Sequence, residues 1–334
     1  MNKSLFPCML CVSLLGCQAS IDSDGREADG NDRAEMPTSL HEPGQYGLHV
    51  IDLVEIPGSA AGRIVDATVC APADPTGEIS DDGPFPLVIM SPGARTSREQ
   101  YMSYCEHLAT WGFVVISQSI IGNDGWFPPV NHKRPAADVS AIIDWATSEQ
   151  NAFAGAIDAN AIGVAGHSMG GKVSFLAAAQ DPRIGAIVGW DPVDANGPFT
   201  PSSSPDWSSA TPELMPNLTL PIAVIGETVN SQGNFFSPAC APSEHNFEQY
   251  YEFAETTSLL VEVFDADHMD WTDSGSCWPC SPCGPNDVQP LAQQITRSLT
   301  TAWFLRHLAG DESVDPQSEL QPQIDAGQIL VQAK

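Results

Sequence analysis

A serine lies in the glycine-rich stretch GHSMGG at residues 166–171. The apolar residues before it (AIGVA, 161–165) are typical of a buried strand, and those after it (GKVSFLAAAQ, 171–180) are typical of a helix. A serine on such a strand-to-helix turn presents its hydroxyl outside the sheet, while Gly166 and Gly170 allow neighbouring backbone to come close. The helix N-terminus also adds positive potential beneath a developing oxyanion. This context predicts that Ser168 is a nucleophile rather than a residue of a purely structural turn.

A serine hydroxyl needs a general base before it can attack an ester. In a strand-turn-helix arrangement of this kind the base comes later in the chain, and three histidines follow the turn. His268 lies in the loop DADHMDWTD, directly after an apolar stretch, which is where the base belongs. His307 lies among apolar residues of a C-terminal helix pattern, and His245 lies in a cysteine-bearing segment, so both are weaker candidates. We expect His268 to be the base.

Short apolar runs alternate with longer amphipathic runs between residues 46 and 310. We expect strands at 63–72, 85–93, 112–120, 161–168, 184–192, 221–227 and 259–268, and helices at 98–111, 136–150, 171–180 and 288–310. Near-continuous apolar strands separated by helices indicate a mainly parallel sheet that is covered on both faces. The prediction is one α/β domain over residues 46–310, followed by a C-terminal tail at 311–334. The Pro- and Ser-rich segment 195–221 is predicted to be a long loop that shapes a binding site.

Three motifs resemble those of a known group of enzymes. SPGARTSREQY (91–101), GHSMGGK (166–172) and GWDPVDANGP (189–198) are similar to chlorophyllases and, more broadly, to related polyester (PET) hydrolases and platelet-activating-factor acetylhydrolases. The resemblance covers about residues 46–310 and implies an α/β-hydrolase fold with a serine-hydrolase mechanism. It also implies an oxyanion hole made by the backbone N–H groups of Met169 and Ala94. Chlorophyllases usually carry arginine where Met169 stands, so chlorophyll is not carried over as the substrate.

Two carboxylates compete for the role of the acid that orients His268. Glu227 ends the stretch PIAVIGE, where many α/β-hydrolases carry their acid, whereas Asp191 ends the preceding stretch IGAIVGWD. The resemblance favours Asp191, because the related patterns place the acid in a turn like DPVD one strand earlier. Asp194, three residues on, is interpreted as a turn or loop carboxylate. The predicted triad is therefore Ser168, His268 and Asp191, with Glu227 as the alternative acid.

The composition narrows the range of partners. The chain carries 42 acidic and 13 basic side chains and has a formal net charge of −29 at pH 7, so nucleic acid is not an expected partner. We expect a monomer that acts without a cofactor on an uncharged small-molecule or polymeric ester. Trp126, Phe127 and Trp190 are weaker candidates for contacts with that substrate. Two alternatives stay open: a non-catalytic binding lipoprotein with this fold, and an amide or lactone hydrolase with the same triad.

The N-terminal residues have the pattern of an export signal. Lys3 precedes a short apolar run that ends in LLGC, which resembles the lipobox of bacterial lipoproteins. The resemblance implies removal of the signal peptide 1–17 up to a lipidated Cys17, which attaches the protein to a membrane, and Gln18 implies the outer membrane. Residues 18–45 are polar and acidic, so we expect a disordered linker there. We expect an exported protein at the outer membrane or cell surface, with a periplasmic or secreted location as the alternative.

Nine cysteines are present, and three of them (Cys8, Cys11 and Cys17) fall in the signal segment. The other six are Cys70, Cys105, Cys240, Cys277, Cys280 and Cys283. An even number in an exported chain predicts up to three disulfides. The spacing in CWPCSPC (277–283) would also suit zinc, but a second clear pair is missing, so no metal is expected. We expect disulfides among the last four cysteines to brace the loop after His268.

Overall fold

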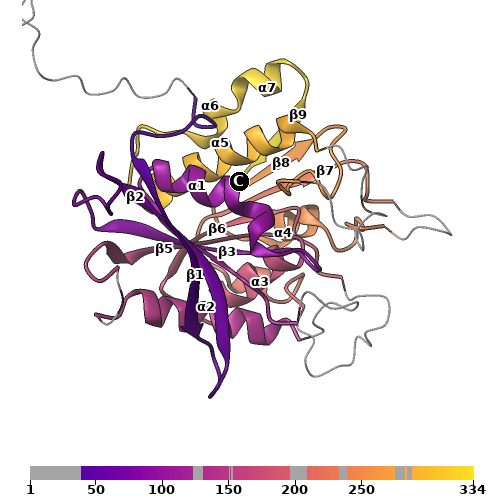
Figure 1. Ribbon diagram of the computed structural model, residues 1–334. Helices are drawn as coiled ribbons and strands as arrows, with labels where there is room; N and C mark the ends of the chain where they lie inside the picture. Colours follow the sequence, from indigo (N-terminus) through magenta and orange to yellow (C-terminus); the bar gives the residue numbers. More distant parts are fainter. Residues whose placement is uncertain are drawn as a thin grey trace, which may run out of the picture. The chain divides into compact units, whose positions relative to one another are not determined.

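A nine-stranded, mostly parallel sheet forms the centre of the protein (Figure 1). The computed structural model describes residues 39–122, 131–149, 151, 153–195, 209–232, 239–274, 283 and 288–334. The strands are Gly47–Pro57 (β1), Ile64–Ala73 (β2), Phe85–Ser91 (β3), Val114–Gln118 (β4), Ile157–His167 (β5), Ile184–Trp190 (β6), Ile222–Glu227 (β7), Ser258–Val263 (β8) and Ile329–Ala333 (β9). Their order is β1-β2-β4-β3-β5-β6-β7-β8-β9, and the strands from β4 to β8 in this order pair in parallel. This confirms the predicted α/β-hydrolase fold.

Helices cover both faces of the sheet. They are Met102–Thr110 (α1), Lys133–Ala146 (α2), Met169–Ala178 (α3), Phe247–Phe253 (α4), Pro290–His307 (α5), Pro316–Glu319 (α6) and Gln321–Asp325 (α7), with 3₁₀ turns at Arg98–Tyr101 and Met215–Asn217. In Figure 1, α2 and α3 lie on one face of the sheet, and α1 and α5 lie on the other. Successive side chains of a strand point to opposite faces. Accordingly, Ile89 of β3 packs in the core under α2 and α3, whereas its neighbour Val88 packs in the core under α1 and α5.

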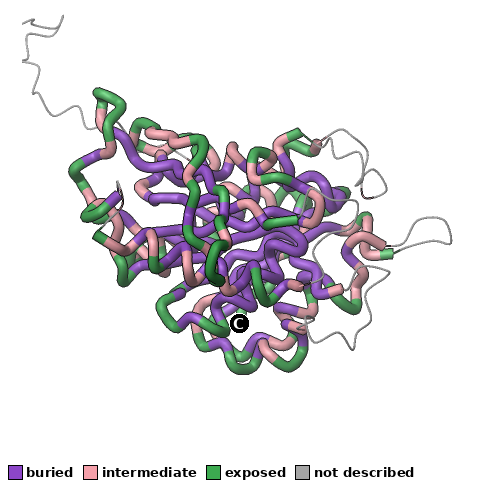
Figure 2. The backbone as a smooth tube through the Cα atoms, turned by 60° about the horizontal axis from the view of Figure 1, so that its bottom comes forward, coloured by how far each residue is buried: buried purple, intermediate pink, exposed green. Residues whose placement is uncertain are grey.

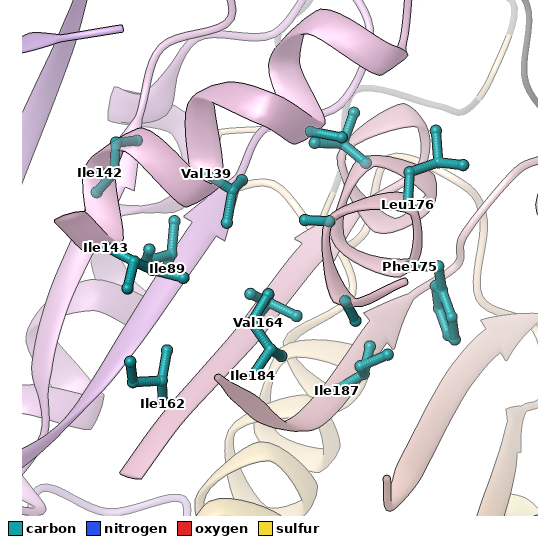
Figure 3. Packing of buried hydrophobic residues seen from close by; sticks show 14 of the residues in the cluster. Ile89, Val139, Ile142, Ile143, Ile162, Val164, Phe175, Leu176, Ile184 and Ile187 are labelled. Atoms are coloured by element: carbon teal, nitrogen blue, oxygen red, sulfur yellow. The ribbon is translucent and has the colours of Figure 1, made fainter. Parts of the chain in front are cut away.

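The packing beneath α2 and α3 fixes the strand that leads to the candidate nucleophile. Val139 of α2 and Leu176 of α3 lie over Ile89 of β3 and Val164 of β5 (Figure 3). All four side chains are buried, and Figure 2 shows buried segments running through the centre of the molecule with exposed segments around them. Full burial of an aliphatic side chain stabilises the fold by about 1.5–3 kcal/mol. The end of β5 is therefore held by buried packing on this face of the sheet.

The C-terminal segment corrects one sequence-based expectation. Residues 311–334, expected to be a tail, form α6, α7 and β9, and β9 pairs antiparallel with β8. The edge strands β1 and β9 and the helix α4 were missing from the prediction. Strand β1 was missed because most of its side chains are exposed or half-buried. Strand β9 is only five residues long, and its pairing with β8 is a tertiary contact that sequence periodicity does not reveal.

The end of the predicted linker is also ordered. Residues 39–45 pack against α1: the His107 Nε2–H donates to the Leu40 carbonyl at 3.0 Å, and the Trp111 indole N–H donates to the Glu42 carbonyl at 2.9 Å. The predicted linker is thus wrong for these residues. The signal peptide 1–17 with Cys17, and the linker up to residue 38, lie outside the described residues. Within the described ranges, none of the helices is long and apolar enough to cross a membrane.

The described residues contain two disulfides, within the range of up to three that the cysteine count predicted. Cys70–Cys105 joins β2 to α1, and Cys240–Cys283 joins the segment after β7 to the segment after His268. Cys277 and Cys280 lie outside the described residues. The second disulfide therefore braces the loop after His268, as expected.

A pair of substitutions in β9 tests whether the C-terminus belongs to the fold. Ile329 is 4% exposed and packs in the core, whereas Leu330, its neighbour on the other face, is 37% exposed. We expect Ile329→Ala to lower the free energy of unfolding by about 2 kcal/mol or more. Leu330→Ala, the control, is expected to change it by less than about 1 kcal/mol. Urea unfolding measures both, and equal small effects would mean that residues 311–334 are a tail after all.

Candidate active site

Ser168 lies at the turn between β5 and α3. Its backbone φ is +54° and its ψ is −119°, a combination that is strained for any residue with a side chain. The Ser168 N–H donates to the Trp190 carbonyl of β6 at 2.9 Å, and the Ser168 carbonyl accepts from the N–H groups of Lys172 and Val193, each at 3.2 Å. These bonds hold the turn in place. The side chain is 8% exposed.

Two glycines make this turn possible, as the sequence predicted. A Cβ atom on Gly170 would lie 2.1 Å from the Ser91 carbonyl oxygen, and one on Gly166 would lie 2.5 Å from the Gly170 backbone. Neither position can accept a side chain, because real Cβ contacts are not that short. The start of α3 is thus pressed directly onto the end of β3. Gly170 follows Met169, and Ser91 and Pro92 precede the turn that contains Ala94, so these two turns lie on adjoining segments.

The structure brings Ser168, His268 and Asp191 together. The His268 Nε2 lies 2.9 Å from the Ser168 Oγ, and the His268 Nδ1 lies 2.5 Å from the Asp191 Oδ2. A carboxylate can only accept, so Nδ1 carries the ring proton and Nε2 is free to accept from the serine hydroxyl. All three side chains are buried, and Asp191 is not exposed at all. A buried Ser-His-Asp chain in this order is the geometry that activates a serine hydroxyl.

The backbone of His268 is held on both sides. Its N–H donates to the Asn230 Oδ1 at 2.8 Å, and its carbonyl accepts from the His167 Nε2 at 2.8 Å. Together with the bonds of the ring, every polar group of His268 therefore has a protein partner. Sequence analysis predicted neither of these two hydrogen-bond partners of the His268 backbone. Asn230 is a single residue in a loop, and His167 was treated as part of the turn.

Glu227, the alternative acid, lies near the site but does not hydrogen-bond to His268 among the contacts described. Its Oε2 accepts from the Asn230 N–H at 2.6 Å, and its Oε1 has no hydrogen-bond partner among the described residues. Burial, reinforced by the charge of Asp191, raises the pKa of Glu227 to about 8. Burial also raises the pKa of Asp191, against the opposing effect of the His268 ring. A protonated Glu227 beside Asp191 keeps two like charges from meeting in a buried site.

Asp194 has a structural place of its own. Its carboxylate lies 2.8 Å from the Lys172 Nζ in a fully buried ion pair, and it accepts from the N–H groups of Ala210 and Thr211. Burial lowers the pKa of Lys172 to about 8, although Asp194 opposes this shift. Because Lys172 is in the first turns of α3, the pair ties the start of the 195–221 insertion, which Asp194 directly precedes, to the helix that starts at the candidate nucleophile. This agrees with the reading of Asp194 as a loop carboxylate.

The structure describes only one of the three aromatic residues that the sequence suggested as substrate contacts. Trp190 is fully buried, and its indole N–H donates to the Thr300 Oγ1 of α5 at 3.0 Å, so its proposed contact with substrate was wrong. It is a core residue because it ends β6 on the face covered by α1 and α5. Trp126 and Phe127 lie outside the described residues. Among the described residues, no group of three or more His, Cys, Asp or Glu side chains could hold a metal ion.

Comparisons with known proteins show which enzymes the chain is similar to. Residues 45–279 match the chlorophyllase family. The chain is 27% identical to Chlorophyllase-1 of Arabidopsis thaliana over 57% of its own length and 60% of that protein, and 24% identical to the chloroplastic Chlorophyllase-1 of Citrus unshiu over 71% and 65%. It is also 27% identical to a bis(hydroxyethyl) terephthalate hydrolase of Streptomyces coelicolor, over 57% of this chain and 52% of that enzyme. The chain thus spans less than two thirds of the length of these relatives.

The state of Glu227 gives a pH-dependent prediction. Its pKa is about 8 in the folded protein against an ordinary 4.5, so between these values the folded state holds a proton that the unfolded state has lost. The contribution of Glu227 to stability is therefore fully present below the lower value and is lost as the pH rises through the higher one. Glu227→Gln removes this dependence. We expect the variant to gain stability relative to wild type between about pH 5 and pH 8, by on the order of 2 kcal/mol.

Urea unfolding at both pH values measures this difference. Glu255→Gln, which changes an exposed carboxylate, is the control and should show no such trend. A difference between wild type and Glu227→Gln that is the same at both pH values would mean that Glu227 is ionised throughout.

Proposed function

The chain belongs to the chlorophyllase family, and from this premise we propose that it is a serine hydrolase of carboxylic esters. The observation that carries the proposal is the buried hydrogen-bonded chain from Ser168 through His268 to Asp191. It lies on a strained strand-to-helix turn, where a nucleophile gains exposure to substrate and support from the helix N-terminus. The names of the relatives, which include chlorophyllases and a terephthalate ester hydrolase, support the same reaction class.

In the proposed acylation step, the Ser168 Oγ attacks the ester carbonyl carbon while His268 Nε2 takes the hydroxyl proton. Asp191 holds the His268 ring in the tautomer that can accept this proton and stabilises the imidazolium that forms. The tetrahedral oxyanion would be bound by the backbone N–H groups of Met169 and Ala94. The contact of α3 with the end of β3 supports this assignment, since it places the two residues on adjoining segments. His268 then gives its proton to the leaving alcohol.

Deacylation repeats these roles with water as the nucleophile. His268 takes a proton from the water, the hydroxide attacks the acyl carbon, and the proton returns to Ser168 as the acid leaves. The balance needs one water and no cofactor. The result is one carboxylic acid and one alcohol for each ester.

For the substrate we propose uncharged esters with short or medium acyl groups, including polyesters. The formal net charge of −29 disfavours anionic substrates near the protein. The similarity to a bis(hydroxyethyl) terephthalate hydrolase supports an aromatic ester of this kind. We also propose that the protein acts after export and attachment through Cys17, which is supported by the lipobox-like LLGC and by the two disulfides.

Removal of the nucleophile tests the proposed reaction. We expect Ser168→Ala to lower turnover of a p-nitrophenyl ester of short chain length by about 10⁶-fold, because the other members of the triad cannot act without it. A fluorophosphonate probe should label the wild-type protein and spare the variant. Folded wild-type protein that neither reacts with the probe nor cleaves esters would instead indicate a binding protein. Cleavage of amides or lactones in preference to esters would redefine the substrate class.

The two carboxylates near His268 can be ranked by substitution. We expect Asp191→Asn to lower turnover by about 10⁴-fold, as the loss of the tautomer-holding acid does in a serine protease. Glu227→Gln should cost far less, because its bonds reach His268 only through Asn230. Initial rates under saturating substrate, with equal folding checked by circular dichroism, measure both. The reverse ranking would assign the acid to Glu227.

A further inference from the structure

His167 precedes the candidate nucleophile, and its imidazole lies beneath the turn. It is 1% exposed, and its ring centroid lies 4.7 Å from that of His268 and 6.2 Å from the ring of Trp271, to which it is nearly parallel. Burial, with the neighbouring His268 ring adding to the effect, lowers the pKa of His167 well below its usual value. The ring is therefore neutral, with one nitrogen that donates and one that accepts.

The partners of His167 determine which nitrogen is which. Its Nε2 lies 2.8 Å from the His268 carbonyl oxygen, which can only accept, so Nε2 carries the proton. Its Nδ1 must then accept, and it lies 2.8 Å from the Tyr101 hydroxyl, which donates to it. The geometry thus fixes the direction of both hydrogen bonds.

Tyr101 connects this imidazole to the turn after β3. The Gly93 N–H donates to the Tyr101 hydroxyl oxygen at 3.1 Å, and the Thr96 Oγ1 lies 3.0 Å from the same oxygen while donating to the Gly93 carbonyl at 2.7 Å. Gly93 is the residue before Ala94, the proposed oxyanion donor. One continuous chain therefore runs from the oxyanion turn through Tyr101 and His167 to the backbone of the proposed base.

Gly93 lies in close contact with the side chains of this hydrogen-bonded series. A Cβ atom at Gly93 would lie 2.9 Å from the His167 Nδ1, 3.1 Å from the Tyr101 hydroxyl and 3.3 Å from the Thr96 Oγ1. Its three nearest neighbours would thus all be polar atoms of the chain. A side chain at Gly93 would force these atoms apart.

We propose that Tyr101 and His167 are positioning residues that set the oxyanion turn and the His268 loop at a fixed separation. The proposal rests on the proposed function, because it concerns the alignment of the same serine-hydrolase site. Neither residue contacts the reacting atoms. Their effect is to place the oxyanion donor and the general base correctly for one tetrahedral intermediate, and misplacement by about 1 Å can cost about a hundredfold in rate.

The test compares two buried tyrosines that are three residues apart. Tyr101→Phe removes a hydroxyl that donates to His167, whereas Tyr104→Phe removes one that has no hydrogen-bond partner among the described residues. Both rings pack against Trp190, which makes Tyr104→Phe a matched control. We expect Tyr101→Phe to lower kcat by about tenfold to a hundredfold, with KM changed by less than about twofold. Tyr104→Phe should change kcat by less than about twofold, because it leaves no partner unsatisfied.

Substitutions of His167 separate positioning from packing. His167→Gln keeps an N–H that can reach the His268 carbonyl, whereas His167→Phe keeps the bulk and loses both bonds. We expect His167→Gln to retain more of kcat than His167→Phe. We expect Tyr101→Phe to have a smaller effect in the His167→Phe background than in wild type, because the bond to His167 is already lost there and only the bonds with the Gly93 N–H and Thr96 remain to lose. Equal kcat for Tyr101→Phe and Tyr104→Phe at matched melting temperature, or additive losses in the double variant, would overturn the proposal.

A measurement without substrate tests the positioning role independently of the proposed hydrolase activity. In ¹⁵N-labelled protein, the imidazole resonances should show His167 protonated at Nε2, and the His268 ring resonances should move in Tyr101→Phe and stay fixed in Tyr104→Phe. Unchanged His268 resonances in both variants would refute the connection. If the wild type is active but the His268 resonances do not change, only the positioning role is refuted. If the wild type is inactive but the His268 resonances do change in Tyr101→Phe, only the hydrolase assignment is refuted.

Discussion

Ser168 is held at a backbone φ of +54° by contacts from three neighbouring strands, and the rest of the site is placed relative to it. Its N–H is bonded to β6, the helix that follows it is pressed onto the end of β3 at Gly170, and its own strand β5 lies between those two. Strain of this kind costs about 1–3 kcal/mol and persists only where the surrounding structure holds it. The buried cores on both faces of β5 provide that support. The parallel sheet is therefore the frame that keeps the hydroxyl in position.

Asp191, the proposed acid, directly follows β6, and this position shapes the electrostatics of the candidate site. Asp191 reaches His268 directly, so the carboxyl at the end of the next strand, Glu227, does not have to bear a charge. Its raised pKa and its bond to the Asn230 N–H turn it into a support for the loop that holds His268. One buried negative charge is thus matched to one histidine, which avoids the cost of an unpaired buried charge.

Loops rather than core packing complete the site. The Lys172–Asp194 ion pair fixes the start of the 195–221 insertion to α3, and the Cys240–Cys283 disulfide ties the segment after β7 to the segment after His268. Tyr101 and His167 join the turn after β3 to His268. Each connection is a polar or covalent link between segments that are far apart in the chain.

The sequence by itself determined the features that depend on neighbours along the chain. The turn at Ser168 was predictable because its glycines, the apolar strand before it and the helix after it are contiguous, and His268 was predictable from its place after an apolar strand. The sheet, its main strands and the presence of disulfides followed from the same local patterns. Without the family resemblance, only the tertiary structure could decide which carboxylate meets His268. Asp191 directly follows β6 and Glu227 ends β7, and their distances to His268 depend on the sheet. The tertiary structure also decided that Trp190 is core, that residues 311–334 complete the sheet, and that Tyr101, His167 and Asn230 hold the site. Such contacts join residues from 38 to 101 positions apart, and no pattern along the chain encodes a hydrogen bond between side chains that only folding brings together.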